Sequence, residues 1–217
     1  MRTVVCFGDS NTYGQVPGAG PLDRFGLMQR WPGVMQTGLG SGWHVIAEGL
    51  SGRTTVHDDP VEGEHKNGRR YLKPCLQSHA PVDLLIIMLG TNDLKRRYNQ
   101  PASEVAMGIA CLILDTKELG TGPGGKMPEI MVVAPPPMQD DLKEWRQIFD
   151  GAPAQSRELA LAFEVIADSL EVHFFDAGSV CTCDPKDGFH MSAEAHAALG
   201  TALAREVEGI GWSDRAP

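Results

Sequence analysis

A serine near the start of the chain and a histidine near its end have the residue types that nucleophilic catalysis needs. Ser10 follows a Gly-Asp pair, and Asp187 precedes His190 by three residues within a short turn. A serine hydroxyl becomes a nucleophile when a histidine accepts its proton, and a carboxylate on the far ring nitrogen fixes the histidine tautomer. Asp184 competes for the carboxylate role, but a residue three positions before the base can fold back onto its ring within one turn. The spacing predicts Ser10 as nucleophile, His190 as general base and Asp187 as the supporting acid.

Two further segments could supply hydrogen-bond donors to a negatively charged reaction intermediate. Asn92 lies in a Gly-Thr-Asn-Asp segment and offers a side-chain amide, and Gly52 lets the backbone approach a reacting carbonyl closely. With the backbone N–H of Ser10 they would form an oxyanion hole, in which one good donor contributes about 3–4 kcal/mol. Taken singly, each segment is also typical of an ordinary turn or helix cap. The prediction therefore depends on all of them meeting in one place.

The elements that must position these residues are five short apolar runs alternating with amphipathic segments. Apolar runs ended by Gly or Pro are typical of strands buried on both faces of a parallel sheet, and the apolar spacing between them predicts helices. The predicted strands are residues 3–7, 43–47, 83–89, 129–134 and 172–175; the predicted helices are residues 31–39, 69–79, 103–119, 155–170 and 192–207. The helix over 69–79 contains Pro74, which favours a break there.

Alternating strands and helices predict an α/β fold in three layers, with helices on both faces of a parallel sheet. Five strands fit the flavodoxin-like order 2-1-3-4-5, in which ligands bind beyond the carboxyl ends of the strands. The segments with Ser10, Gly52, Asn92 and His190 all fall at such ends. Two long polar segments, 14–29 and 53–68, are expected to be lids, subunit contacts or disordered. The 217 residues contain no clear linker, so one domain over 1–217 is expected.

The composition argues against several other classes of protein. The formal net charge of −9, with no basic tract, disfavours nucleic-acid or anionic-membrane partners. No apolar stretch is long enough to span a membrane, and the first residues do not resemble a signal peptide. An odd number of cysteines, five, indicates reduced thiols and a cytoplasmic protein. The spacing of Cys181 and Cys183 differs from that of zinc or thioredoxin-type motifs, so no metal is expected.

Four segments resemble, in order, the sequence blocks of the SGNH, or GDSL-type, hydrolases: Gly8-Asp9-Ser10, Gly52, Gly90-x-Asn92-Asp93 and Asp187-x-x-His190. The resemblance spans nearly the whole chain and implies the flavodoxin-like fold, the same triad and the same oxyanion hole. Asn11 stands where the family often has Leu, and it is expected to alter the pocket wall rather than the mechanism. Thr12 stands where the nucleophile elbow of lipase-type α/β-hydrolases has its second glycine, which argues against that class.

Longer stretches around these blocks, including residues 48–55 and 174–179, are similar to the bacterial arylesterase/acyltransferase branch of the family. That similarity implies hydrolysis of short acyl esters by a homo-oligomer, with aryl acetates and acetylated carbohydrates as leading substrates. Tyr13 and Gln15 stand where the branch often has tryptophans, which favours water over alcohols as the acyl acceptor. The pocket is expected to contain Tyr13, Trp145, Ile148 and Phe149, with a core role for Phe149 as an equal alternative. The mechanism needs no organic or metal cofactor.

Two enzymatic alternatives and one non-enzymatic alternative remain open. An acyltransferase or perhydrolase would pass the same acyl group to an alcohol or peroxide. A thioesterase or lysophospholipase would need a long apolar groove for a long acyl chain. A flavodoxin-like binding module would keep the fold without catalysis, but no Gly-rich nucleotide-binding motif follows any predicted strand.

Overall fold

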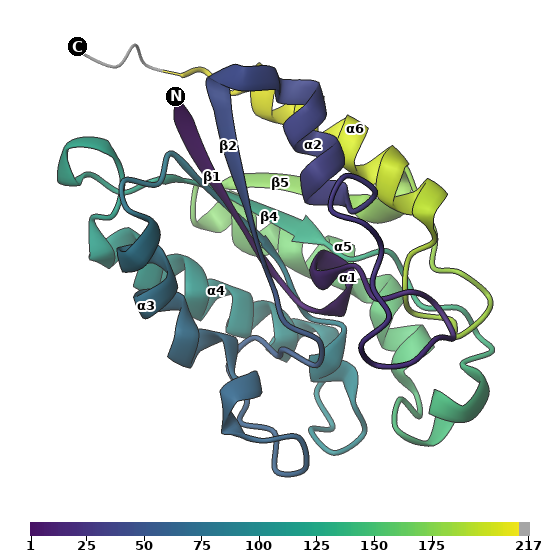
Figure 1. The fold of residues 1–217 in the computed structure, drawn as a ribbon. Helices are drawn as coiled ribbons and strands as arrows, with labels where there is room; N and C mark the ends of the chain where they lie inside the picture. The colour runs from purple at the N-terminus through teal and green to yellow at the C-terminus, as the bar shows by residue number, and fades with distance from the viewer. Residues whose placement is uncertain (213–217) are drawn as a thin grey trace.

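One sheet of five parallel strands forms the centre of the molecule (Figure 1). The computed structural model describes residues 1–212, and its strands lie in the order β2-β1-β3-β4-β5. The predicted fold class and strand order are confirmed, and the predicted strands differ from the observed ones by at most two residues at an end. The strands are β1 (Arg2–Gly8), β2 (Trp43–Gly49), β3 (Leu84–Met88), β4 (Glu129–Ala134) and β5 (His173–Asp176). The predicted domain boundary at residue 217 lies outside the described residues.

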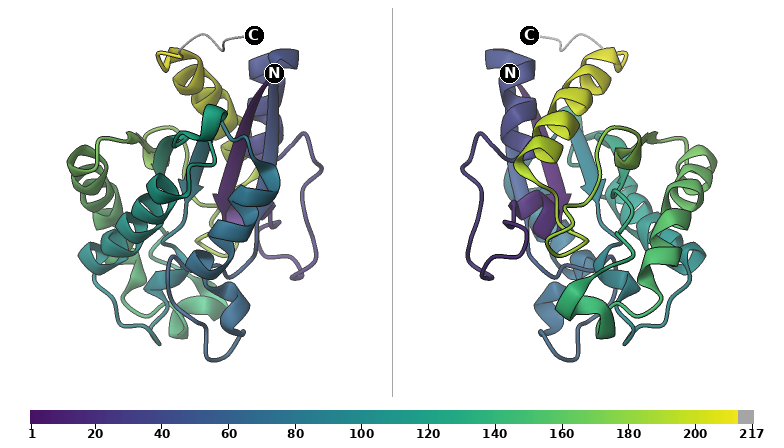
Figure 2. Two further views of the ribbon diagram at one scale, coloured as in Figure 1. Left: turned by 90° about the vertical axis from the view of Figure 1, so that its left-hand side faces the viewer. Right: turned by 90° about the vertical axis from the view of Figure 1, so that its right-hand side faces the viewer.

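Helices cover both faces of the sheet and make a three-layer fold (Figures 1 and 2). Successive side chains of β3 enter two different cores, with Leu85 and Ile87 in one and Leu84 and Ile86 in the other. This double burial explains why the strand is apolar throughout. The first core is covered by α3 (Gly68–His79), α4 (Ala102–Leu119) and α5 (Ala152–Ser169), and the second by α2 (Trp31–Leu39) and α6 (Ala193–Gly209).

Helix α3 runs unbroken through Pro74, so the break that the sequence favours does not occur there. A proline inside a helix removes one backbone hydrogen bond and costs about 3 kcal/mol. The same helix buries Leu72, Cys75 and Leu76 against the sheet. Burial of an aliphatic side chain such as leucine contributes about 1.5–3 kcal/mol, so this apolar face offsets the cost of the proline.

The two long polar segments of the sequence, 14–29 and 53–68, both reach the carboxyl edge of the sheet. The first follows the short helix α1 (Ser10–Tyr13), and the second contains the 3-10 turn η2 (Glu64–Lys66). Backbone hydrogen bonds fold the second segment on itself, with Thr54 N donating to Lys66 O over 2.9 Å. Across residues 1–212, the helices all fall short of the length and apolarity of a membrane span.

Candidate active site

Three strand ends bring the site segments together. Gly8, the last residue of β1, pairs with Gly49 of β2 on one side and with Met88 of β3 on the other. Because these strands are parallel, the chain leaves all three at the same edge of the sheet. Ser10 begins α1 immediately after β1, and the 3-10 turn η3 (Asn92–Leu94) follows β3. The residues predicted from the first and third blocks are therefore neighbours.

Ser10, His190 and Asp187 form a continuous hydrogen-bonded chain. The Nε2 atom of His190 lies 2.9 Å from Oγ of Ser10, and its Nδ1 atom lies 2.8 Å from Oδ2 of Asp187. Ser10 is 5 % exposed, His190 7 % and Asp187 2 %, so these groups interact in a largely water-excluded setting. The geometry allows His190 to take a proton from Ser10 while Asp187 holds the opposite ring nitrogen.

The carboxylate of Asp187 is held ionised by several hydrogen-bond donors. Burial alone would raise its pKa, but the His190 ring and the backbone N–H groups of His190 and Gly18 outweigh burial and lower the pKa to about 2. Gly18 N donates to Oδ2 over 2.8 Å, so segment 14–29 supports the acid directly. Asp184, the competing acid, instead accepts a hydrogen bond from Lys186 N and shapes the turn.

The predicted oxyanion donors face the same cavity as Ser10. Asn92 and Gly52 both line it. Nδ2 of Asn92 lies 3.2 Å from Oδ2 of Asp9, which leaves the second amide proton of Asn92 for another acceptor. Gly52 has φ of 83°, a conformation that favours glycine. Burial raises the pKa of Asp9 to about 6. The hydrogen bond from Asn11 N and the charge of His190 act in the opposite direction but do not outweigh burial.

Asn11 does not line the cavity, so its expected role in the pocket wall is wrong. Its Nδ2 atom donates to Phe189 O over 3.0 Å, and its Oδ1 atom accepts from Met191 N over 2.9 Å. The carboxamide thereby bonds the backbone on both sides of His190, although about 180 positions separate the partners. Asn11 joins the segment of Ser10 to that of His190, a role for which the sequence holds no local signal.

The cavity beside Ser10 has a volume of about 750 Å³ and contains all four side chains predicted for the pocket, Tyr13, Trp145, Ile148 and Phe149. The aromatic rings of Trp145 and Phe149 pack on Phe189, with centroids 5.3 and 5.1 Å away. Phe189 lies in turn 4.1 Å from the ring of His190. Phe149 is also part of the core, being only 1 % exposed, and whether it contacts substrate stays a prediction.

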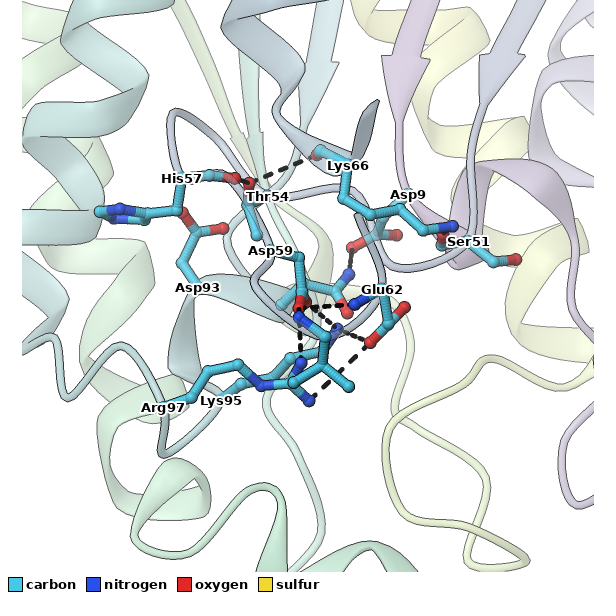
Figure 3. Close-up of polar contacts among 12 residues, drawn as sticks. Asp9, Ser51, Thr54, His57, Asp59, Glu62, Lys66, Asp93, Lys95 and Arg97 are labelled. Atoms are coloured by element: carbon cyan, nitrogen blue, oxygen red, sulfur yellow. Dashed lines mark hydrogen bonds and ion pairs between the residues drawn. The ribbon is translucent and has the colours of Figure 1, made fainter. Parts of the chain in front are cut away.

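A cluster of charged residues beside the Gly52 segment is a feature that sequence reasoning missed (Figure 3). The buried carboxylate of Asp59 lies 3.4 Å from Nζ of Lys95 and 2.6 Å from Nη1 of Arg97. Glu62 Oε1 lies 2.5 Å from the same Lys95 nitrogen. Although burial opposes it, hydrogen bonds from the backbone of residues 62 and 61 and the charge of Lys95 hold the pKa of Asp59 below its usual range. No short-range pattern links positions 59 and 62 with 95 and 97.

Among residues 1–212, the one group of side chains that could hold a metal ion does not line this cavity. Glu48, Cys75 and His79 place one ligand atom each within 4.8 Å of one another, and none of the three lines the cavity of Ser10. Nε2 of His79 lies 2.7 Å from Oε1 of Glu48. All five cysteines are free thiols, and Cys181 and Cys183 bond separate backbone carbonyls instead of each other.

Comparison with known proteins identifies close structural relatives. A family model described as the GDSL-like lipase/acylhydrolase family matches residues 6–198. The native structure of the M. smegmatis aryl esterase is 40 % identical, with a TM-score of 0.92, and the match covers 97 % of this chain and 100 % of that one. Est24, a carbohydrate acetylesterase from Sinorhizobium meliloti, is 41 % identical with the same TM-score and the same coverage. No curated protein matches the chain in a sequence search.

Proposed function

Because the chain belongs to the GDSL-like lipase/acylhydrolase family, we propose that it is a serine esterase that hydrolyses short-chain acyl esters through an acyl-enzyme. Aryl acetates and acetylated carbohydrates are the leading substrates. The observation that carries the proposal is the contact between Ser10 Oγ and His190 Nε2 at 2.9 Å, with Asp187 on Nδ1, opening onto a cavity. The aryl esterase and carbohydrate acetylesterase relatives support the same chemistry.

The reaction begins when Ser10 Oγ attacks the ester carbonyl while His190 Nε2 accepts the hydroxyl proton. The carbonyl oxygen becomes an oxyanion, which accepts hydrogen bonds from the backbone N–H groups of Ser10 and Gly52 and from Asn92 Nδ2. His190 then protonates the departing alcohol, which leaves an acyl group on Ser10. Water, deprotonated by His190, attacks this acyl group, and the acid departs as the proton returns to Ser10.

Labelling and substitution of Ser10 test this mechanism. A fluorophosphonate should add its mass once, at Ser10, and Ser10→Ala should remove both the label and nearly all turnover of p-nitrophenyl acetate. Asp187→Asn is expected to lower kcat by about 10³–10⁴-fold, since the imidazole loses the group that fixes its tautomer. A label on another residue, or a Ser10→Ala protein of normal activity, would contradict the proposal.

Substrate panels separate the remaining alternatives. Turnover is expected to fall steeply beyond about four acyl carbons. Burial of each further methylene would contribute about 0.8 kcal/mol to binding, and a cavity of limited length does not bury it. Equal turnover of a decanoyl ester would favour a long-chain thioesterase or lysophospholipase. Products formed with added alcohol or peroxide measure acyl transfer against hydrolysis.

We further propose a cytoplasmic homo-oligomer. The free thiols, four of them buried, suit a reducing compartment. Leu22 and Val61, which line the cavity, are 86 % and 76 % exposed, and apolar side chains so exposed are typical of contact surfaces. Sedimentation at several protein concentrations tests the assembly, and a monomer throughout would refute it.

A further inference from the structure

Glu62 places one carboxylate oxygen directly against Gly52, the residue whose N–H is proposed to hold the ester carbonyl. A Cβ atom built at Gly52 would collide with Oε2 of Glu62 and would lie 3.4 Å from Cε of Lys66. All three residues line the cavity that contains Ser10. A substrate carbonyl held at Gly52 would therefore have a carboxylate beside it.

The two oxygens of Glu62 have different surroundings. Oε1 lies 2.5 Å from Nζ of Lys95 and 3.9 Å from Nη2 of Arg97, so both cations act on that oxygen. Within residues 1–212, no hydrogen bond or ion pair reaches Oε2, and the Glu62 side chain is 37 % exposed. The ion pairs that tie segment 53–68 to Lys95 and Arg97 through Glu62 use only Oε1. The second oxygen is free to accept a hydrogen bond from a ligand.

The charges around Glu62 favour a neutral ligand group over an anion. Asp59 and Glu62 balance Lys95 and Arg97, and Lys95 is only 4 % exposed, so its charge is already neutralised by its partners. A carboxylate or phosphate brought to Oε2 would meet the negative charge of the Glu62 carboxylate directly. A hydroxyl would instead donate a charge-assisted hydrogen bond. Lys66 Nζ donates one hydrogen bond to Ser51 O over 2.8 Å and can donate another to the oxygen of that hydroxyl.

The cavity also has a second, apolar part to which the acyl group is assigned. Trp145, Ile148 and Phe149 come from one segment after β4, whereas Glu62 and Lys66 come from the segment after β2. An ester presents an acyl group and an alcohol group on the two sides of its carbonyl. Assigning the acyl group to these aromatic side chains leaves the alcohol part for the rest of the cavity, which Glu62 and Lys66 line.

We propose that Glu62 is a specificity-determining residue that binds a hydroxyl group next to the ester bond in the alcohol part of the substrate. The substrates are then acyl esters of neutral polyols such as sugars. This inference rests on the proposed esterase function and adds the residue that recognises the alcohol part.

Two acetates with rings of equal size test the inference. One is a monoacetylated methyl glucoside with free neighbouring hydroxyls, and the other is cyclohexyl acetate, which has none. The wild-type protein should favour the glucoside in kcat/KM, and Glu62→Gln should lower the ratio of the two values by about tenfold, the effect of losing one charge-assisted hydrogen bond. Glu62→Asp keeps a carboxylate for Lys95 but withdraws Oε2 from Gly52, and it should lower the ratio similarly.

Glu64→Gln is the matched control, because Glu64 lies in the same segment and its 72 % exposed side chain is paired with Arg70 outside the cavity. Its ratio should equal that of the wild type. A ratio within twofold of the wild type in both Glu62 variants overturns the inference, and urea unfolding checks that each variant folds. A wild-type protein that cleaves p-nitrophenyl acetate without preferring the glucoside also overturns the inference and leaves the esterase proposal standing. A protein that cleaves none of the three esters overturns both.

Discussion

The carboxylate of Asp9 binds the carboxamide of Asn92, with Oδ2 of Asp9 lying 3.2 Å from Nδ2 of Asn92. The other oxygen of Asp9 accepts from Asn11 N over 2.9 Å, so a carboxylate with two acceptor oxygens joins the start of α1 to the turn after β3. Both groups are buried, and burial makes the ionised Asp9 unfavourable enough to raise its pKa to about 6. Because this buried acid holds the Asn92 amide at the edge of the cavity, we expect Asp9 to be a positioning residue for the proposed oxyanion hole.

Asp9→Asn tests this role. An asparagine has one acceptor oxygen, so either Asn92 or the backbone of Asn11 loses its partner. We expect kcat to fall about 10–100-fold with little change in KM, less than the ~10²–10³-fold loss typical of removing an oxyanion donor outright. The decisive measurement is a double-mutant cycle. If Asp9 acts through Asn92, then Asp9→Asn should cost almost nothing in an Asn92→Ala background, whereas additive losses would show an independent role.

Gly52→Ala should impair both folding and activity. The residue has φ of 83°, where an alanine costs about 1–2 kcal/mol, and its Cβ would also collide with Glu62. Because the collision moves either the Gly52 N–H or Glu62, kcat/KM for p-nitrophenyl acetate should fall by at least about tenfold, as for a weakened oxyanion donor.

Gly124→Ala is the matched control for backbone strain. Gly124 has φ of 67°, and a Cβ there would meet no atom within 4 Å. Urea unfolding and kinetics of both variants separate strain from the collision. Equal activity of the two variants would show that a Cβ atom at position 52, next to Glu62, does not impair catalysis.

Phe149→Ala is expected to lengthen the acyl chains that the protein accepts. The ring lines the cavity and is almost fully buried, so its removal should cost about 3–5 kcal/mol of stability and open space beside Phe189. We expect the ratio of octanoyl to acetyl p-nitrophenyl ester turnover to rise about tenfold, in line with apolar surface gained by two methylenes.

Phe163→Ala provides the comparison for this variant. Phe163 is a buried phenylalanine of the same core that does not line the cavity. It should lose similar stability and keep the acetyl preference. An unchanged acyl profile in Phe149→Ala would assign the residue to the core alone.

The sequence predicts the sheet well because each strand carries its own signal. The five residues of β3 are apolar and all buried, and their alternation between two cores leaves little freedom in how they pack. The carboxyl edge then follows from parallel strands, which is why Ser10, Asn92 and His190 could be expected to meet. Their catalytic roles stay predictions until the labelling and substitution experiments are done.

Other parts of the site have no comparable local signal. Asn11 bonds the backbone around His190, and Gly18 supports Asp187, through hydrogen bonds that span most of the chain. The Glu62–Lys95 pair depends on how segment 53–68 folds, which its polar sequence does not specify. Pro74 shows the converse, since a local helix-breaking signal is overridden by packing of α3 on the sheet.

His196 should make the folded protein sensitive to moderate acid. This α6 side chain is fully buried, its Nδ1 accepts from Trp31 N over 3.3 Å, and within residues 1–212 its Nε2 has no partner. Burial, and then the charges of His190 and Arg30, lower its pKa to about 4, against 6.5 for an unperturbed histidine. The unfolded chain therefore binds the proton first. The stability that neutral His196 contributes is present above about pH 6.5 and is lost as the pH falls through 4, a loss on the order of 2–3 kcal/mol.

Asp9 and Asp93 act with the opposite sign, because their pKa values are raised by burial, to about 6 and about 7. Their contribution to the free energy of unfolding is present at low pH and is lost as the pH rises through those values. The pH dependence of the wild-type stability alone therefore does not isolate the effect of His196. His196→Gln does isolate it, since glutamine keeps an acceptor for Trp31 N without titrating. Urea unfolding midpoints measured from pH 4 to 7 should fall less on acidification in this variant than in the wild type. The exposed His44, replaced by Gln, should leave the curve unchanged. If the two substitutions alter the curve equally, the acid sensitivity does not come from the buried imidazole.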